Sequence, residues 1–137
     1  MKKYFIDTSF LIALLVENDK NHEQAVEIEE LLEDGLFVTT HLVLCEFLNH
    51  FCESGKFWRK IALSAVRELE NDSRTKIFPV TSASFRAASE LYGRRADKGF
   101  SLTDCSSMFI MKAENIREVL TADHHFTQEG FHVLLES

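Results

Sequence analysis

Short apolar runs alternate with longer amphipathic segments along the chain. Five runs have the length and side chains of strands: residues 4–6, 36–39, 77–80, 119–122 and 133–135. Apolar side chains at helical spacing predict helices between them, at residues 10–16, 22–34, 41–52, 57–69, 82–94 and 101–113. This alternation predicts an α/β fold with a mostly parallel sheet and helices packed on it. Because there is no internal repeat or linker, we expect residues 1–137 to form a single domain.

Several residues mark where these elements begin and end. Thr39 or Thr40 is a suitable N-cap for the helix that follows, and Ser101 with Asp104 has the spacing of a capping box. Pro79 is expected to confine its strand to an edge or an end of the sheet, because proline lacks the N–H that a central strand donates.

Composition and charge narrow the functional classes. The chain has 137 residues, of which 45% are hydrophobic, with 12 Phe but only 5 Gly and 1 Pro, so it has ample material for a core. The 15 Lys and Arg against 22 Asp and Glu give a formal net charge of −7. Any nucleic-acid contact therefore needs a local basic patch, because the overall field repels phosphates.

The apolar runs and the cysteines favour a protein that works inside the cell. No stretch approaches the roughly 20 apolar residues of a membrane span, and no signal-peptide cleavage region is recognisable. Cys45, Cys52 and Cys105 form no CxxC pair and are interpreted as small buried thiols in a reducing compartment. We therefore expect a cytoplasmic protein without a membrane contact.

Four acids lie in stretches that are otherwise uncharged. Most of the 22 acids occur in charge-rich runs that are typical of solvated helix faces. The four exceptions are Asp7, Glu46, Asp104 and Asp123. A carboxylate in apolar surroundings costs free energy unless a cation or hydrogen-bond donors compensate. Glu46 needs an explanation most of all, because its apolar neighbours leave little solvated surface.

The predicted elements place these acids at one edge of the sheet. Asp7 and Asp123 follow strands, whereas Glu46 and Asp104 lie in the first turns of helices. In an open parallel sheet such positions can converge at the carboxyl ends of the strands, where ligands bind. Carboxylates packed together repel one another, and a divalent cation resolves that conflict. Oxygen ligands without a His or Cys cluster favour Mg²⁺ or Mn²⁺ over Zn²⁺, which makes metal-assisted phosphoryl chemistry the reaction class.

Simpler roles are open for three of the acids. Asp7 before Thr8 fits the N-cap of a helix, and Asp104 fits the acid of a capping box with Ser101. Asp123 fits a cap of the short turn that follows it. The four acids together are a stronger signal than any one of them.

In this pattern of acids the chain resembles the PIN domain family, in particular the small VapC-type toxins of prokaryotic toxin–antitoxin systems. The resemblance covers essentially the whole chain and rests on short motifs in a fixed order. These are Asp-Thr-Ser at residues 7–9 after the first strand, Glu46 in the third helix, Leu-Thr-Asp at residues 102–104 opening a late helix, and Leu-Thr-Ala-Asp at residues 120–123 closing the fourth strand. It implies a three-layer α/β/α fold with a five-stranded parallel sheet. It also implies a Mg²⁺- or Mn²⁺-dependent endoribonuclease activity.

Carried over residue by residue, the resemblance gives four catalytic, metal-binding acids: Asp7, Glu46, Asp104 and Asp123. Asp7 and Asp104 are expected to bind the metal directly, and the other two to complete the site directly or through water. Ser9 or Thr8 is expected to orient Asp7 by a hydrogen bond, and Ser9 is also a candidate to contact the substrate. The implied reaction is hydrolysis of an RNA phosphodiester by an activated water, while the cation neutralises charge that develops on the phosphate.

RNA has to reach an acidic site on an acidic protein. The candidates to guide its phosphates are the cations just before the helix of Asp104: Arg94, Arg95 and Lys98. A second basic group is Lys56, Arg59 and Lys60. His124 and His125 are interpreted either as substrate contacts or as part of the loop structure. Phe57 and Trp58 are interpreted either as core or as interface residues. The resemblance further implies a homodimer and a cognate antitoxin protein that occupies the site.

Other functions compete with this one. A housekeeping RNA-processing nuclease would use the same chemistry, and a non-catalytic scaffold would keep the same fold. A response-regulator receiver also has acids and Mg²⁺ at the carboxyl edge of its sheet. It would, however, have an adjacent acidic pair where Asp7 stands alone, and a lysine after its last strand, whereas no lysine follows Lys112. The five glycines form no glycine-rich loop, which argues against P-loop and dinucleotide-binding folds.

Overall fold

The computed structural model describes residues 1–136, and five strands within them form one parallel sheet in the order β3-β2-β1-β4-β5. The strands are β1 (Lys3–Ile6), β2 (Leu36–Thr40), β3 (Thr75–Phe78), β4 (Glu118–Leu120) and β5 (His132–Val133). Their alternation with helices confirms the predicted α/β fold and its five-stranded parallel sheet.

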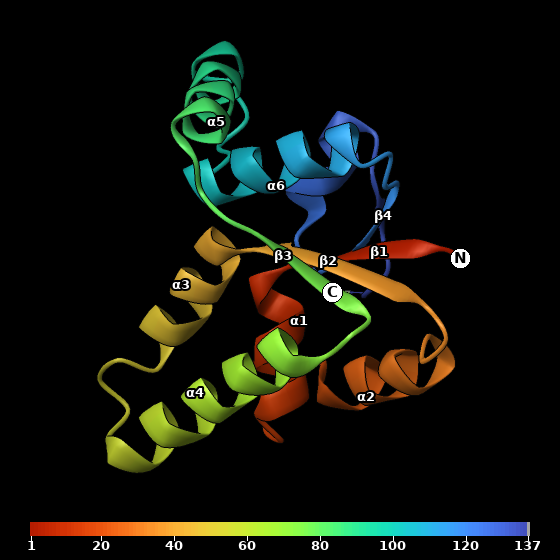
Figure 1. The fold of residues 1–137 in the computed structure, drawn as a ribbon, viewed down its shortest axis with the longest axis vertical. Helices are drawn as coiled ribbons and strands as arrows, with labels where there is room; N and C mark the ends of the chain where they lie inside the picture. The colour runs from red at the N-terminus through yellow and green to blue at the C-terminus, as the bar shows by residue number, and fades with distance from the viewer. Residues whose placement is uncertain (137) are drawn as a thin grey trace.

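Helices cover both faces of this sheet. They are α1 (Thr8–Leu15), α2 (His22–Leu31), α3 (His41–His50), α4 (Lys56–Asn71), α5 (Ser82–Arg94), α6 (Leu102–Ala113) and the short 3₁₀-helix η1 (His124–Glu129). Figure 1 shows the sheet between two layers, with α5 and α6 on one side and α1, α2 and α4 on the other. The arrangement is the three-layer α/β/α fold expected from the resemblance. No helix in residues 1–136 is long and apolar enough to span a membrane.

The core lies where the inner strands meet the helices of the two layers. Its largest fully buried side chains include Phe5 on β1, Phe47 on α3, Met108 on α6 and Phe126 on η1. Burying each such side chain stabilises the fold by about 1.5 to 3 kcal/mol. The core therefore anchors α3, α6 and η1, which carry Glu46, Asp104 and the segment after Asp123, against the same sheet.

The strand order determines where a binding site can form. The chain runs outward from β1 to β2 and β3, and then crosses to β4 on the other side of β1. The carboxyl ends of β1 and β4 are in register, because Ile6 pairs with Leu120 and the N–H of Asp7 donates to the Leu120 carbonyl at 3.1 Å. Asp7 and Thr121 therefore come together at the point where the strand order reverses, which is the usual ligand position in open parallel sheets. The order also excludes the receiver alternative, whose sheet is ordered 2-1-3-4-5.

Some element boundaries differ from the prediction. β3 spans Thr75–Phe78 instead of 77–80, because it pairs with β2 only as far as Thr40 opposite Phe78, and Pro79 then ends the strand. The prediction that Pro79 marks an edge strand is confirmed. The residues after Asp123 form η1, and Asp123 caps it, so the interpretation of Asp123 as the cap of a short turn is confirmed.

Cys45 and Cys52 correct the prediction of buried thiols, because both are exposed and only Cys105 is buried. Helix α3 buries one face, with Val43, Leu44 and Phe47, and leaves the opposite face open to solvent. Cys45 lies on this open face beside the polar Glu46 and Asn49, and Cys52 lies past the end of the helix at His50.

Candidate active site

Asp7 lies at the carboxyl end of β1, in the N-cap position of α1. Its side chain makes no capping hydrogen bond within residues 1–136, and Oδ2 instead accepts a hydrogen bond from the Thr121 hydroxyl at 2.7 Å. Asp7 is only 4% exposed, and its Oδ1 has no hydrogen-bond partner in the part of the chain that the structure describes. A buried carboxylate oxygen without a donor is costly, so helix capping does not explain this residue.

Thr121 and Ser9 form a small network that holds Asp7 in place. The Ser9 hydroxyl lies 2.9 Å from Thr121 Oγ1, which also accepts the N–H of Asp123 at 3.0 Å. A hydroxyl has one proton and two lone pairs. Since Thr121 gives its proton to Asp7, Ser9 must donate to Thr121, and Ser9 Oγ in turn accepts the N–H of Ala122 at 3.1 Å. Ser9 thus orients Asp7 through Thr121.

Burial raises the pKa of Asp7 from its ordinary value of 3.8 to about 7. The hydrogen bond from Thr121 opposes this rise, as does the backbone N–H of Thr8, which lies close by without completing a hydrogen bond. The charges of Asp104 and Glu46 raise the pKa further. Three of the four predicted acids therefore act on one another across the edge of the sheet.

Asp104 is both the acid of a capping box and a member of this group. Its Oδ2 accepts the N–H of Ser101 at 3.1 Å, and the N–H of Asp104 donates to Ser101 Oγ at 3.0 Å. The predicted cap at the start of α6 is confirmed. Burial raises the pKa of Asp104 despite these hydrogen bonds, and the charge of Asp123 raises it further. The cap therefore orients a carboxylate that also faces other acids.

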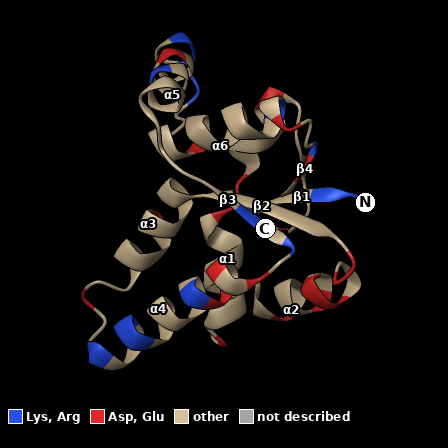
Figure 2. Cartoon of the chain, viewed as in Figure 1, with Lys and Arg blue, Asp and Glu red and all other residues tan. Residues whose placement is uncertain are grey.

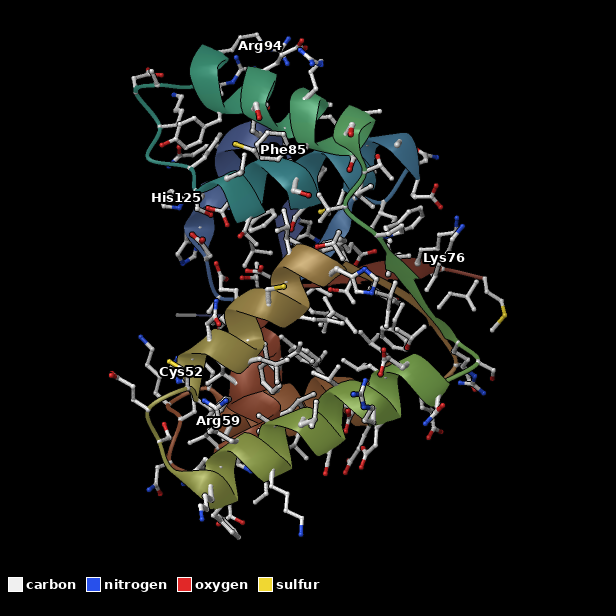
Figure 3. The ribbon with its side chains drawn as sticks, turned by 60° about the vertical axis from the view of Figure 1, so that its left-hand side comes forward. Cys52, Arg59, Lys76, Phe85, Arg94 and His125 are labelled. Carbon is white, nitrogen blue, oxygen red and sulfur yellow. The ribbon has the colours of Figure 1, made fainter. Side chains whose placement is uncertain are left out.

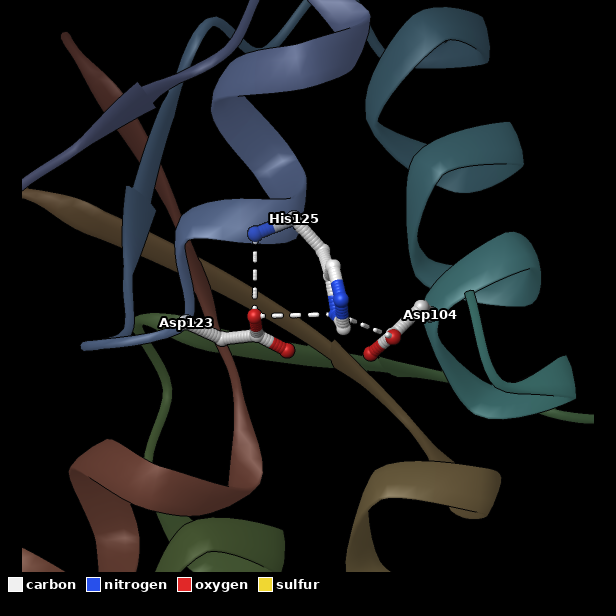
Figure 4. A group of neighbouring side chains, drawn as sticks. All are labelled: Asp104, Asp123 and His125. Carbon is white, nitrogen blue, oxygen red and sulfur yellow. Dashed lines mark hydrogen bonds and ion pairs between the residues drawn. The ribbon is translucent and has the colours of Figure 1, made fainter. Parts of the chain in front are cut away.

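Asp123 caps the first turn of η1 and brings His125 to the acids. Its Oδ1 accepts the backbone N–H of His125 at 2.9 Å and lies 3.1 Å from His125 Nδ1. The same ring nitrogen lies 3.7 Å from Asp104 Oδ2. Figure 4 shows the His125 ring between the two carboxylates. One ligand atom from each of Asp104, Asp123 and His125 lies within 4.8 Å of the others, which is close enough for a shared metal ion.

Glu46 corrects one expectation from the sequence. It was predicted to lie among apolar side chains with little solvated surface, but it is exposed on the open face of α3. Its charge nevertheless acts on Asp7. The Glu46 carboxylate is therefore close enough to Asp7 for their charges to interact, but it is solvated and needs no buried partner of its own.

The predicted phosphate guides are not equivalent. Arg94, at the end of α5, and Lys98, in the following loop, are exposed. Arg95 is instead paired with Glu129 of η1, whose other oxygen lies 3.2 Å from Lys112 of α6. The Arg95 and Lys112 contacts hold the pKa of Glu129 below its usual range. Arg95 thus helps to fasten η1 to α5 and α6.

Sequence reasoning missed two residues that build the site, Thr121 and Glu129, and left His125 open between substrate contact and loop structure. Thr121 was present in the motif 120–123, and a threonine between a buried strand and an acid was the available signal. The spacing of His125 two positions after Asp123 was a second signal, because a capped turn folds such a side chain back. The position of Glu129 carried no signal, since its partners come from separate helices.

These residues fit a divalent cation. The set contains carboxylates from four elements, a buried oxygen of Asp7 with no donor in residues 1–136, and two acids, Asp7 and Asp104, whose pKa values are raised by burial and by the charges of neighbouring acids. A cation would supply the missing partner of Asp7 and neutralise the repulsion between the acids. Carboxylates outnumber the one histidine, which favours a hard ion.

Solved structures with the same fold span nearly the whole chain. VapC20 from Mycobacterium tuberculosis, described as a sarcin–ricin loop cleaving toxin, is 23% identical with a TM-score of 0.80, over 93% of this chain and 95% of that one. VapBC2 from Rickettsia felis, solved with a DNA fragment from its promoter, is 18% identical with a TM-score of 0.69, over 96% of both chains. FitAcB from Neisseria gonorrhoeae is 17% identical with a TM-score of 0.63, over 95% of both.

Comparison of the sequence with protein families identifies the family of this chain more directly than the solved structures do. No curated protein matches the chain significantly. The PIN domain, however, matches residues 4–131, which include both strands at the switch point, all four acids and η1. Since this match extends over nearly the whole sequence, the chain belongs to the PIN domain family.

Proposed function

We propose that the chain is a divalent-metal-dependent endoribonuclease that acts as the toxin of a toxin–antitoxin pair. The observation that carries this proposal is Asp7: a buried carboxylate with one oxygen fixed by Thr121, the other without a donor in residues 1–136, and a pKa raised to about 7. A buried carboxylate of this kind destabilises the fold unless a cation compensates its charge. Membership in the PIN family and the likeness to VapC20, VapBC2 and FitAcB support the nuclease and toxin roles.

Asp7, Asp104, Asp123 and Glu46 are the residues that would hold the cation, which we propose to be Mg²⁺ or Mn²⁺. Such an ion, when bound, lowers the pKa of water and neutralises charge on a phosphate. Thr121 and Ser9 keep Asp7 oriented, and the capping box keeps Asp104 oriented, so neither carboxylate has to reorganise during the reaction. The His125 ring lies between the side chains of Asp104 and Asp123, with Nδ1 3.7 Å from Asp104 Oδ2 and 3.1 Å from Asp123 Oδ1.

The solvent-side position of Glu46 leaves the site open to a polymer. Asp7 is buried at the sheet edge, whereas Glu46 and the partly exposed Asp123 lie towards solvent. A phosphate in the middle of an RNA strand can therefore reach the acids without an end of the RNA having to enter the site first. An endonuclease requires such access. We propose that exposed Arg94 and Lys98 assist this approach by attracting backbone phosphates.

We also propose that the protein works as a homodimer and binds an antitoxin. Helix α5 packs against α6 and leaves several large apolar side chains exposed along its length: Val80 just before it, then Phe85 and Tyr92. Phe85 and Tyr92 are seven positions apart and so share one face of the helix. A second copy of the chain would cover this face.

Cleavage of total RNA by the purified protein tests the nuclease. Fragments are expected with Mg²⁺ or Mn²⁺ but not with chelator, and both Asp7→Asn and Asp104→Asn are expected to abolish them. Asparagine keeps an oxygen for the Thr121 or Ser101 hydrogen bond, so these changes remove charge with little loss of structure. Asp34→Asn, at an exposed acid after α2, is the matched control and should cleave like wild type. Absence of cleavage by folded wild-type protein free of bound inhibitor would refute the proposal.

Growth of the producing cells tests the toxin role. Expression of the wild type is expected to arrest growth, and Asp7→Asn is expected to relieve the arrest. A protein that cleaves RNA in vitro but leaves growth unchanged would instead support a housekeeping role in RNA processing.

A further inference from the structure

The far end of α3 and the start of α4 form a surface that the acidic site does not use. The chain turns between these helices, and the first two turns of α4 expose Lys56, Phe57, Arg59 and Lys60, which we call the α4 tip. Figure 2 shows these cations as a group at one end of α4, away from the acid-rich helix α2. None of the three cations takes part in an ion pair within residues 1–136.

The α4 tip is poorly suited to starting a helix. Lys56 and Arg59 place positive charge at the end of α4 where the helix dipole is already positive, and no acid compensates in the first turn. The N-cap is Gly55, which has no side chain to accept a hydrogen bond from the first turn. Phe57 is 68% exposed. Residues that destabilise a helix locally, such as these cations and this exposed ring, are expected at surfaces that bind a partner.

Aromatic packing holds the α4 tip in a fixed position. Trp58 stacks on buried Phe51, with ring centroids 5.6 Å apart and planes at 11°. Phe57 packs edge-on against Trp58 at 5.9 Å. Arg59 donates to the carbonyl of Cys52 at 2.8 Å, which ties α4 to the end of α3. Phe57 is therefore an exposed ring on a rigid base, with cations one helical turn away.

The α4 tip adjoins the end of α3, the helix that carries Glu46. Glu46 of α3 acts on Asp7 by its charge, and Cys52, whose carbonyl accepts a hydrogen bond from Arg59, follows six residues later, just past the end of α3 at His50. In Figure 3, His125 and, beyond α3, Cys52 and Arg59 lie on the same side of the molecule. One strand of nucleic acid is long enough to contact both places.

We propose that the α4 tip binds unpaired nucleotides of the RNA whose backbone is cleaved at the acidic site, with Lys56 and Lys60 on phosphates and Phe57 stacked on a base. This inference rests on the proposed function. Exposed cations attract phosphates, and an aromatic ring stacks on any base, so the two together are typical of surfaces that bind single strands. The tip also explains how a chain of net charge −7 holds a polyanion: the positive charge is local.

Binding of a fluorescently labelled single-stranded RNA in chelator, measured by anisotropy at several salt concentrations, tests this inference without cleavage. The double variant Lys56→Gln/Lys60→Gln is expected to bind more weakly and to lower the slope of log K against log salt by about 1.4, because two phosphate contacts are lost. Phe57→Ala is expected to weaken binding by about 5- to 150-fold with the slope unchanged, because it removes stacking and no charge.

Matched controls remove charge or apolar surface elsewhere. Lys20→Gln/Arg117→Gln changes two exposed cations, and Leu31→Ala changes an apolar side chain that is 74% exposed on α2. Both controls should bind RNA like wild type. In the cleavage assay, the tip variants are expected to raise KM and leave kcat unchanged, whereas Asp104→Asn removes kcat. Circular dichroism of every variant checks folding.

Two results would overturn the inference. RNA affinity that is the same in the tip variants and the controls would show that the tip does not bind RNA, and a simultaneous change in oligomeric state would identify it as a protein interface. Wild-type protein that binds no RNA at all would also overturn it. Protein that binds RNA through the tip but cleaves none with either metal would refute only the proposed function, so the two failures are distinguishable.

Discussion

Asp7→Asn is expected to stabilise the metal-free protein at alkaline pH while abolishing its activity. Burial and the neighbouring acids raise the pKa of Asp7 from 3.8 to about 7. Each pKa unit corresponds to about 1.36 kcal/mol, so the ionised carboxylate lowers the free energy of unfolding by about 4 kcal/mol above neutral pH. Asparagine carries no charge, so the variant does not lose this part of the free energy of unfolding above neutral pH.

The direction of the pH dependence follows from the raised pKa. The folded state keeps a proton on Asp7 that the unfolded state releases, so this group favours folding below about pH 4 and the contribution is lost as the pH rises through about 7. The asparagine amide leaves a buried N–H group without an acceptor, at a cost of about 1 to 3 kcal/mol at every pH. The variant is therefore expected to be about 1 to 3 kcal/mol less stable than wild type near pH 4, and more stable by a similar amount near pH 8.

Urea unfolding in chelator across this pH range, followed by circular dichroism, measures the difference. Asp34→Asn is the control, because an exposed acid is expected to leave the difference from wild type nearly constant with pH. A constant difference for Asp7→Asn as well would show that Asp7 ionises as easily in the folded state as in the unfolded state, and would refute the argument that the fold leaves this carboxylate in need of a cation.

Three further predictions concern the surroundings of Asp7. Mg²⁺ or Mn²⁺ at about 100 times its dissociation constant is expected to stabilise wild type by about 2.7 kcal/mol in thermal unfolding and to leave Asp7→Asn unchanged, whereas equal shifts in both would place the ion elsewhere. Thr121→Val keeps the buried shape but removes the donor to Asp7, and is expected to lower cleavage at least tenfold with KM unchanged; full activity would show that Asp7 needs no positioning. Glu129→Gln removes two ion pairs, each worth about 0.2 to 1 kcal/mol because the cationic partners are partly exposed, and is expected to lower the free energy of unfolding at neutral pH by about 0.4 to 2 kcal/mol. This loss should fade in acid, and Glu27→Gln, at an exposed acid of α2, is the control.

The sequence predicted the fold well because its signals are local. Pro79 indicated an edge or an end of the sheet, Thr39 or Thr40 the cap of α3, and Ser101 with Asp104 the capping box of α6; the structure has β3 at the edge and Thr40 as the cap. Each of these signals lies within a few residues and can be recognised without knowing how the rest of the chain folds. The boundary of β3 was misplaced because it depends on where β2 stops pairing, which is a property of two segments far apart in sequence.

The site was less predictable where it depends on packing. The isolation of Asp7 in an apolar stretch correctly indicated a buried carboxylate, but the same pattern misled at Glu46, because α3 turns that face to solvent. The same exposed face explains why Cys45 was misjudged. Helical spacing identifies the faces of a helix, and only the neighbouring elements decide which one is covered.

The capping roles and the site roles of these acids support each other. Asp104 and Asp123 each use a carboxylate oxygen to hold a backbone N–H of their own turn, at 3.1 and 2.9 Å. A side chain fixed by its own turn is oriented before any ligand arrives, and so loses little entropy when it binds one. Asp7 has no such cap within residues 1–136, and its orientation depends on Thr121, which follows the neighbouring strand. The site is therefore complete only when β1 and β4 pair, which makes its geometry a consequence of the sheet order itself.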